Sequence, residues 1–367
     1  MIFEAAEGTT AAGHAYVRDY VRGKLASGAT PSEVLEQFSC SAEDDIDEES
    51  LVRTVLASVQ RRQDVDLGRE LVTAASAGNA AEVDALLAAG APWDALDASG
   101  HSAGSHALRG GHDACVARLC AAGAACMLAD FERRAPTAAG PFAGATNYQQ
   151  QRLRYEGGAT AAAAERLVDE NDRPVMMRWE LALMEAHAAA MQPAGRSVLN
   201  VGFGLGLVDR CLQSRRPKAH HIVECHPDVL AAMQQEGWAS KPGVRILQGR
   251  WQDVLPGDAT YDAIFWDTFG ESVDELFEFM ALLPTLLNPG GTFSYFNGIA
   301  SHDEFLHRVY GDAARQRLAA LGLRLRFEAV PVEVDERTFA GVEGGRNWWT
   351  LERYLLPIAE LTTVGES

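Results

Sequence analysis

The chain has 367 residues, 47% of them hydrophobic and 23% charged, so it is long enough for two ordinary globular domains. Thirty-two basic residues against fifty-one acidic ones give a net charge of −19. This charge argues against direct nucleic-acid binding and suits either a cationic partner or simply a soluble surface. We expect no apolar run long enough to cross a bilayer and no secretory signal, hence a cytoplasmic or nuclear protein without a membrane partner.

Residues 1–66 are predicted to form an N-terminal helical region. Apolar residues recur at helical spacing between Tyr16 and Leu25, and Ser50 is placed to cap a second helix. The acidic run at 43–49 between them is typical of a solvated loop or helix start.

An internal repeat with a period of 33 residues follows, over residues 67–134. The segments 86–90 (Leu-Leu-Ala-Ala-Gly) and 119–123 (Leu-Cys-Ala-Ala-Gly) are one period apart. This is the period of ankyrin units, which consist of two helices and a turn and serve as binding scaffolds. The repeat therefore predicts an all-α ankyrin-like domain that binds a protein partner. We interpret His101, His106 and His112 as structural turn and helix residues and expect no metal there.

Residues 135–147 are rich in Ala, Gly and Pro and predict a linker, after which 148–367 alternates between strand-like and helical stretches. This alternation predicts an α/β domain with a doubly wound, seven-stranded sheet. The expected strands are 197–203, 221–225, 244–249, 261–267, 292–297, 325–332 and 348–358. The expected helices are 175–191, 206–214, 227–237, 273–287 and 302–321.

The first two expected strands end in residues that suit an adenosine-containing cofactor. Gly202, Gly204 and Gly206 follow the first strand, where glycine lets a ligand approach the backbone. Glu224 ends the second strand, where a carboxylate can accept both ribose hydroxyls. Sites for S-adenosylmethionine and for NAD share these two features, so the features alone leave both cofactors open.

Three further features favour S-adenosylmethionine. Trp251 and Gln252 follow the third strand, where an aromatic and a polar side chain can hold an adenine edge. Asp267 ends the fourth strand, at the switch point where a substrate meets a cofactor. The turn 287–291 (Leu-Asn-Pro-Gly-Gly) before the fifth strand is typical of methyltransferases. Together they predict a class I methyltransferase-like domain and not a dehydrogenase.

Four segments in this order carry a resemblance to a known family: 200–204 (Asn-Val-Gly-Phe-Gly), 224–227 (Glu-Cys-His-Pro), 249–253 (Gly-Arg-Trp-Gln-Asp) and 267–271 (Asp-Thr-Phe-Gly-Glu). The chain resembles the arginine delta-N-methyltransferases, or type IV protein arginine methyltransferases, whose catalytic domain is similar to guanidinoacetate N-methyltransferase and whose plant members can carry ankyrin repeats. The resemblance implies that Asp267 and Glu180 face a guanidinium and that Tyr148, Met176 and Met184 close over the cofactor. It implies a cofactor lining of Phe203, Gly204, Leu205, Gly206, Leu207, Val208, Glu224, Cys225, His226, Trp251 and Gln252.

There is also a physical reason to expect two acids, Asp267 and Glu180, at a guanidinium site. A guanidinium stays protonated, and its nitrogen lone pairs are delocalised. Carboxylates can grip its N–H groups in a bidentate fork, and one of them can accept the proton that is released on methylation. We expect Asp267 to be the principal orienter and Glu180 the second clamp or base. The plainer alternatives are a strand-end cap for Asp267 and an exposed helix-face acid for Glu180.

Three functions remain open at this point. The favoured one is methylation of arginine in proteins, at the internal delta nitrogen if the resemblance holds. The second is methylation of a small guanidino compound; Phe269 argues against it, because the small-molecule relatives usually carry Tyr there. The third is a catalytically silent scaffold. Transfer of a methyl group from a sulfonium needs no Lewis acid, so we expect no metal at His220, His221 or His226.

Overall fold

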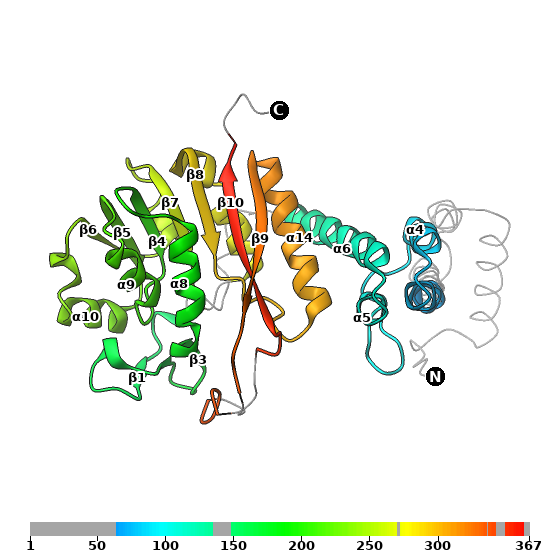
Figure 1. Ribbon diagram of the computed structural model, residues 1–367, viewed down its shortest axis with the longest axis horizontal. Coiled ribbons are helices and arrows are strands. Elements are labelled where there is room, and N and C mark those ends of the chain that lie inside the picture. Colours follow the sequence, from blue (N-terminus) through cyan, green and yellow to red (C-terminus); the bar gives the residue numbers. More distant parts are fainter. Residues whose placement is uncertain (1–63, 135–147, 270–271, 336, 343–348, 363–367) are drawn as a thin grey trace, which may run out of the picture. The chain divides into compact units, whose positions relative to one another are not determined.

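Figure 1 shows the computed structural model of the chain, which describes residues 64–134, 148–269, 272–335, 337–342 and 349–362. The chain divides into two compact units, residues 1–122 and 123–367, and the boundary falls within helix α6 (Asp113–Arg134). The helices expected before residue 64 and the expected linker 135–147 lie outside the described residues.

The first unit contains short helices with side-chain caps. Asn79 caps α4 (Ala80–Ala88) by accepting from the Glu82 N–H, and Ser102 caps α5 (Ala103–Arg109) by accepting from the Ser105 N–H. Such caps satisfy N–H groups that the helix itself leaves unpaired. The starts of α4 and α6 are separated by one 33-residue period of the sequence repeat. Whether the unit is an ankyrin domain stays a prediction.

Helix α6 corrects one expectation from the sequence. Of the helices in the described residues, it is the one long and apolar enough to cross a membrane, judged by length and composition alone. Its second half packs Ala124 and Phe131 into a core, and the Phe131 ring meets Phe277 edge-on with 5.5 Å between the ring centroids. A core helix therefore accounts for this apolar run.

The second unit is built on a seven-stranded sheet, as the sequence predicts. Its strand order is β6-β5-β4-β7-β8-β10-β9. The central pairs are parallel, whereas β10 lies between β8 and β9 and is antiparallel to both. The strands are β4 (Ser197–Val201), β5 (Ala219–Glu224), β6 (Val244–Gln248), β7 (Tyr261–Trp266), β8 (Leu287–Tyr295), β9 (Leu323–Pro331) and β10 (Arg353–Leu361).

Helices cover both faces of this sheet, because alternate residues of its buried strands point to opposite sides. Val198 packs in one core with Met184 and Leu212, from α8 and α9, whereas its neighbour Leu199 packs in another with Phe277. Figure 1 shows α8 lying in front of the strands. The first face carries α8 (Leu181–Ala190), α9 (Leu207–Ser214) and α10 (Pro227–Gln235), and the second carries α12 (Val273–Met280), α13 (Leu283–Leu286) and α14 (Glu304–Ala320).

The helix predicted over 175–191 is wrong in its first part. Three short antiparallel strands precede the main sheet: β1 (Arg154–Glu156), β2 (Arg166–Val168) and β3 (Pro174–Met177). Pairing of β3 with β2 gives its backbone an extended form, and a 3₁₀ turn, η2 (Arg178–Glu180), leads into α8. The backbone therefore changes direction at the segment that carries Met176 and Glu180.

The helix predicted over 273–287 is also interrupted. It splits into α12 and α13, and Pro284 lies in the first turn of α13, where a missing N–H costs nothing. Strand β8 then begins at Leu287 and includes the stretch predicted as a turn.

Candidate active site

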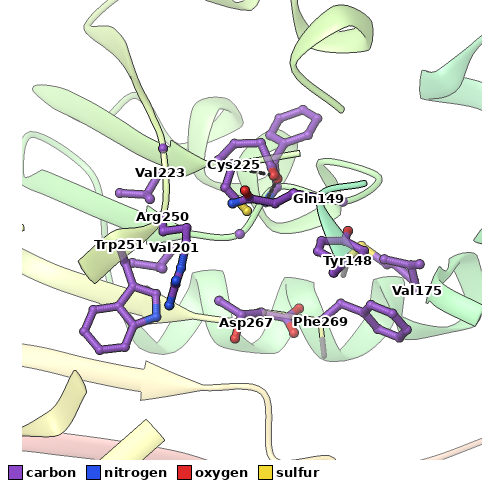
Figure 2. A pocket seen from close by; sticks show the side chains of 17 residues that line it. Tyr148, Gln149, Val175, Val201, Val223, Cys225, Arg250, Trp251, Asp267 and Phe269 are labelled. Atoms are coloured by element: carbon purple, nitrogen blue, oxygen red, sulfur yellow. Dashed lines mark hydrogen bonds between the residues drawn. The ribbon is translucent and has the colours of Figure 1, made fainter. Parts of the chain in front are cut away.

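A cleft opens at the carboxyl ends of β4, β5 and β7, where the chain leaves neighbouring parallel strands (Figure 2). Open α/β sheets bind ligands at this edge. The cleft is lined by Tyr148, Gln149, Val175, Met176, Val201, Gly202, Phe203, Gly204, Val223, Glu224, Cys225, Gly249, Arg250, Trp251, Asp267, Thr268 and Phe269.

The loop after β4 depends on glycine at Gly202. Its φ is +92°, and a Cβ there would lie 1.8 Å from the backbone oxygen of Asp267. The two strand ends are this close because the Asp267 N–H donates to the Val201 oxygen at 2.9 Å. Glycine at this position therefore lets the floor of the cleft and the end of β7 meet.

Glu224 points its buried carboxylate at the same loop. Its Oε2 accepts from the Phe203 N–H at 3.0 Å, and its Oε1 accepts from the Cys225 and His226 N–H groups at 2.7 Å each. Burial raises the pKa of Glu224, although the three N–H groups oppose this shift by favouring the ionised form. A carboxylate offers about four acceptor positions, so this one is fixed in place and keeps room for a ligand hydroxyl.

Two side chains predicted to close over the cofactor do lie at the cleft. The Met176 sulfur accepts from the Leu205 N–H at 3.3 Å and faces Gly204. The Tyr148 ring lies between His226 and Phe269, with centroid distances of 4.8 and 5.3 Å. The third, Met184, is fully buried in the core beneath α8.

Two carboxyls lie at this part of the cleft: the half-buried Asp267 lines it, and the buried Glu180 is not among the lining residues. The Asp267 Oδ2 atom is shielded from solvent and has no hydrogen-bond partner. Burial, and then the charge of Asp209, raise the pKa of Asp267 to about 7. Burial, and then the charge of Asp267, raise the pKa of Glu180 well above its usual range, although the Met177 N–H donates to its Oε1 at 2.8 Å. The negative charge of Asp267 therefore disfavours ionisation of Glu180, an arrangement that a nearby cation would relieve.

The helix behind Glu180 is fixed by a buried histidine. His187 of α8 has its Nδ1 2.7 Å from the Ser294 hydroxyl and its Nε2 2.7 Å from the Tyr354 hydroxyl. Burial lowers the pKa of His187 to about 3, so the ring is neutral at physiological pH. The contact joins the last turn of α8, whose N-cap is Glu180, to β8 and β10.

The structure separates the predicted site residues into two groups. Those that line the cleft are Tyr148, Met176, Gly202, Phe203, Gly204, Glu224, Cys225, Trp251 and Asp267. Those that are not among the lining residues are Glu180, Met184, Leu205, Gly206, Leu207, Val208, His226 and Gln252. The lining residues that our sequence analysis missed are Gln149, Val175, Val201, Val223, Gly249, Arg250, Thr268 and Phe269. Most of these are adjacent in sequence to the predicted strand-end residues, and this adjacency could have indicated them. No pattern in the sequence indicated Gln149 or Val175.

Among the described residues, one group of side chains has the spacing of a metal site: Asp97, His101 and His106 in the first unit. The Asp97 Oδ1 accepts from the Ser99 and His101 N–H groups, and its Oδ2 lies 2.8 Å from the His106 Nε2. These contacts, the His101 N–H first, lower the pKa of Asp97 to about 2. They are the contacts of a closed turn, which accounts for the cluster without an ion.

The strand order, the antiparallel β10 and the glycine loop beside a strand-end acid define a methyltransferase-like α/β protein. A family model described as guanidinoacetate N-methyltransferase matches residues 151–319. Protein arginine N-methyltransferase 2 of Cryptococcus neoformans is 34% identical over 334 residues, covering 82% of this chain and 88% of the relative. The chain belongs to the protein arginine N-methyltransferase 2 family.

Other relatives of that name match the second unit more narrowly. The one from Aspergillus fumigatus is 38% identical over 213 residues, or 56% of this chain. The chain spans about half the length of several of these relatives: 50% for Aspergillus fumigatus, 43% for Yarrowia lipolytica and 48% for Aspergillus oryzae. Among solved structures, N-methyltransferase NodS from Bradyrhizobium japonicum is 13% identical with a TM-score of 0.37, over 50% of this chain and 97% of that one.

Proposed function

We propose that this chain transfers a methyl group from S-adenosylmethionine to a guanidino nitrogen of arginine in a protein. The observation that carries the proposal is the half-buried Asp267 carboxyl in the cleft beside the glycine loop, with the buried Glu180 close enough for the charge of Asp267 to raise its pKa. Relatives named protein arginine N-methyltransferase 2 support the same acceptor. We further propose the internal delta nitrogen as the target, following the family resemblance.

The cleft suits the cofactor. Gly202 and Gly204, both with positive φ, let the loop pack closely against Asp267 and Met176 at the cleft, and the Glu224 carboxylate is oriented toward the loop. Trp251 adds an aromatic surface, and Met176 and Tyr148 flank the opening. These residues would hold S-adenosylmethionine, which supplies an electrophilic methyl group on a positively charged sulfur. The chain's contribution is a preorganised, largely dry pocket that positions the reacting atoms.

The acids act on the acceptor. Without a cation, burial and a neighbouring negative charge, that of Asp209 for Asp267 and that of Asp267 for Glu180, favour the protonated carboxyls. A guanidinium favours their ionised forms and receives charge-assisted hydrogen bonds. The Asp267 Oδ2 has no other partner and is therefore assigned the orienting contact. Glu180, held by the Met177 N–H, is the second clamp and can accept the proton that leaves the methylated nitrogen.

We also propose that residues 67–134 are an ankyrin-like module that recruits a protein partner. The 33-residue offset between the starts of α4 and α6 supports this assignment. The intracellular location expected from the sequence remains part of the same proposal.

Labelled-methyl transfer tests the proposed function. Incubation with radiolabelled S-adenosylmethionine and an arginine-rich protein should yield labelled arginine after hydrolysis of the protein to amino acids. Chromatography of the hydrolysate distinguishes methylation of the internal nitrogen from methylation of a terminal one. If guanidinoacetate is methylated and the arginine-rich protein is not, the proposal of a protein substrate is wrong. If the cofactor binds but neither acceptor is methylated, the chain is a scaffold.

Glu224→Gln should weaken cofactor binding. A glutamine places an amide NH₂ among three N–H donors and loses acceptor capacity, so we expect about 10- to 100-fold weaker binding of S-adenosylmethionine in isothermal titration calorimetry. Glu185→Gln, at an exposed position of α8, is the matched control and should bind like the wild type. Equal affinity of the Glu224 variant and the wild type would remove Glu224 from the site.

A further inference from the structure

A buried carboxylate lies beneath the glycine loop and is not part of the site described above. Asp209 of α9 is fully buried. The Asn200 Nδ2 donates to both of its oxygens at 2.9 Å, and the His220 Nε2 lies 3.0 Å from its Oδ1. A fully buried acid needs such partners, because an unpaired charge is costly away from water.

Asn200 joins this carboxylate to the loop. The same Nδ2 atom donates to the Gly202 oxygen at 2.7 Å, immediately before the residues that line the cleft. The Asn200 Oδ1 is buried without a hydrogen-bond partner. The side chain therefore leaves its oxygen unsatisfied while its amide nitrogen connects Gly202 to Asp209.

The histidine beside Asp209 also contacts a glutamine. The Gln213 Nε2 donates to the His220 Nδ1 at 3.0 Å, so the ring hydrogen resides on Nε2 and points to Asp209. Among the described side chains, the only ion-pair geometry at Asp209 is this histidine; no Lys or Arg pairs with it. No Lys or Arg side chain among the described residues therefore offsets the charge of a carboxylate at this position.

The Asp209 carboxylate lies one amide nitrogen from the cleft, because the Asn200 Nδ2 atom bonds both to it and to the oxygen of Gly202, which lines the cleft. The charge of this carboxylate therefore acts on the cleft. It is the second cause, after burial, of the raised pKa of Asp267, which lines the site. A field that disfavours a second negative charge there favours a positive one. S-adenosylmethionine carries a positive sulfonium, whereas the product left after methyl transfer, S-adenosylhomocysteine, is neutral at sulfur.

We propose that Asp209 is a positioning residue with two effects: through Asn200 it fixes the glycine loop, and through its charge it makes the cleft favour the cationic cofactor over the neutral product. The proposal rests on the proposed function, because it presupposes that this cofactor binds here. The two effects separate in experiment, since one depends on a hydrogen bond and the other on charge.

The test compares the affinities of S-adenosylmethionine and S-adenosylhomocysteine by isothermal titration calorimetry on the full chain. Asp209→Asn removes the charge and keeps the size, and it should lower the preference for S-adenosylmethionine by about three- to tenfold. Asp209→Glu keeps the charge and should retain the preference even if both affinities fall together. Asp253→Asn, which removes an exposed charge on α11 (Trp251–Val254), controls for net charge and should leave the preference unchanged.

Asn200→Ala tests the loop contact separately. It retains the charge of Asp209 but loses the bond to the Gly202 oxygen, so both affinities should fall by a similar factor with the preference unchanged. An unaltered preference in Asp209→Asn, or an equal loss of preference in Asp209→Glu, would overturn the charge effect. Wild-type protein that binds neither compound would instead refute the proposed function, and this inference with it.

Discussion

Asp267→Asn is expected to abolish methyl transfer and, at the same time, to stabilise the fold above pH 7. An asparagine cannot ionise, so it cannot form charge-assisted bonds to a guanidinium or draw positive charge from the attacking nitrogen. Removing such a preorganised group from a buried site typically slows catalysis about 10²- to 10³-fold, and losing the orienting charge as well should exceed this. Initial rates with labelled cofactor measure the loss.

The gain in stability follows from the raised pKa of Asp267. Its carboxyl is protonated up to about pH 7 in the folded protein but only up to 3.8, its usual value, when unfolded. The folded state therefore binds more protons between these values, and the free energy of unfolding falls as the pH rises through this window. Asparagine removes this penalty, so the variant should be more stable than the wild type by about 1–3 kcal/mol at pH 8.

Urea denaturation at pH 8 and pH 5.5 distinguishes this effect from a general change in packing. The gain at pH 5.5 should be about half of that at pH 8, because only part of the window has then been crossed. Asp253→Asn, an exposed Asp→Asn change, should alter neither rate nor stability. If Asp267→Asn retains most of the methyltransferase activity, or if its gain in free energy of unfolding is the same at both pH values, Asp267 is an ordinary strand-end cap.

Gly202→Ala should destabilise the second unit by about 4 kcal/mol or more. The added Cβ would lie 1.8 Å from the Asp267 backbone oxygen, which cannot move without breaking the contact between β4 and β7. A positive φ adds about 1–2 kcal/mol for a residue with a side chain, and an overlap of this kind belongs with the largest single-residue effects.

Gly195→Ala is the matched control for this change. Gly195 also has a positive φ, +70°, but nothing lies within 4 Å of its added Cβ. It should therefore cost only the conformational part, about 1–2 kcal/mol in urea denaturation. If the Gly202 variant is insoluble while the Gly195 variant folds, the expected destabilisation is confirmed. If both variants lose the same free energy of unfolding, the close approach of Gly202 to Asp267 does not matter.

The parts of the fold predicted well are those whose signal is local. Buried strands of a parallel sheet are short apolar runs between turns, and all seven expected strands of the main sheet are present. Glu224 and Asp267 were found for the same reason, since the residues that end adjacent parallel strands meet at one edge. The alternation of strands and helices and the chemistry of the strand ends together were enough to predict a methyltransferase-like domain.

The parts predicted poorly depend on partners distant in sequence. Val175, Met176 and Met177 have the composition of a helix start, but they pair with β2 and become a strand. The resulting turn buries Glu180, which rules out the exposed helix-face alternative. Asp209 gave no signal at all: an acid in the first turn of a helix is ordinary, and only the folded chain places Asn200 and His220 around it.

The position of β10 has a consequence for the order in which the protein assembles during synthesis. Strand β9 pairs only with β10 in this sheet, so it has no partner until residues 353–361 have left the ribosome. The His187–Tyr354 contact that holds α8 spans 167 residues and must also wait. The strands around the glycine loop pair among themselves much earlier. A nascent chain can therefore form the glycine loop and the strand ends around it well before the contact that holds α8 is made.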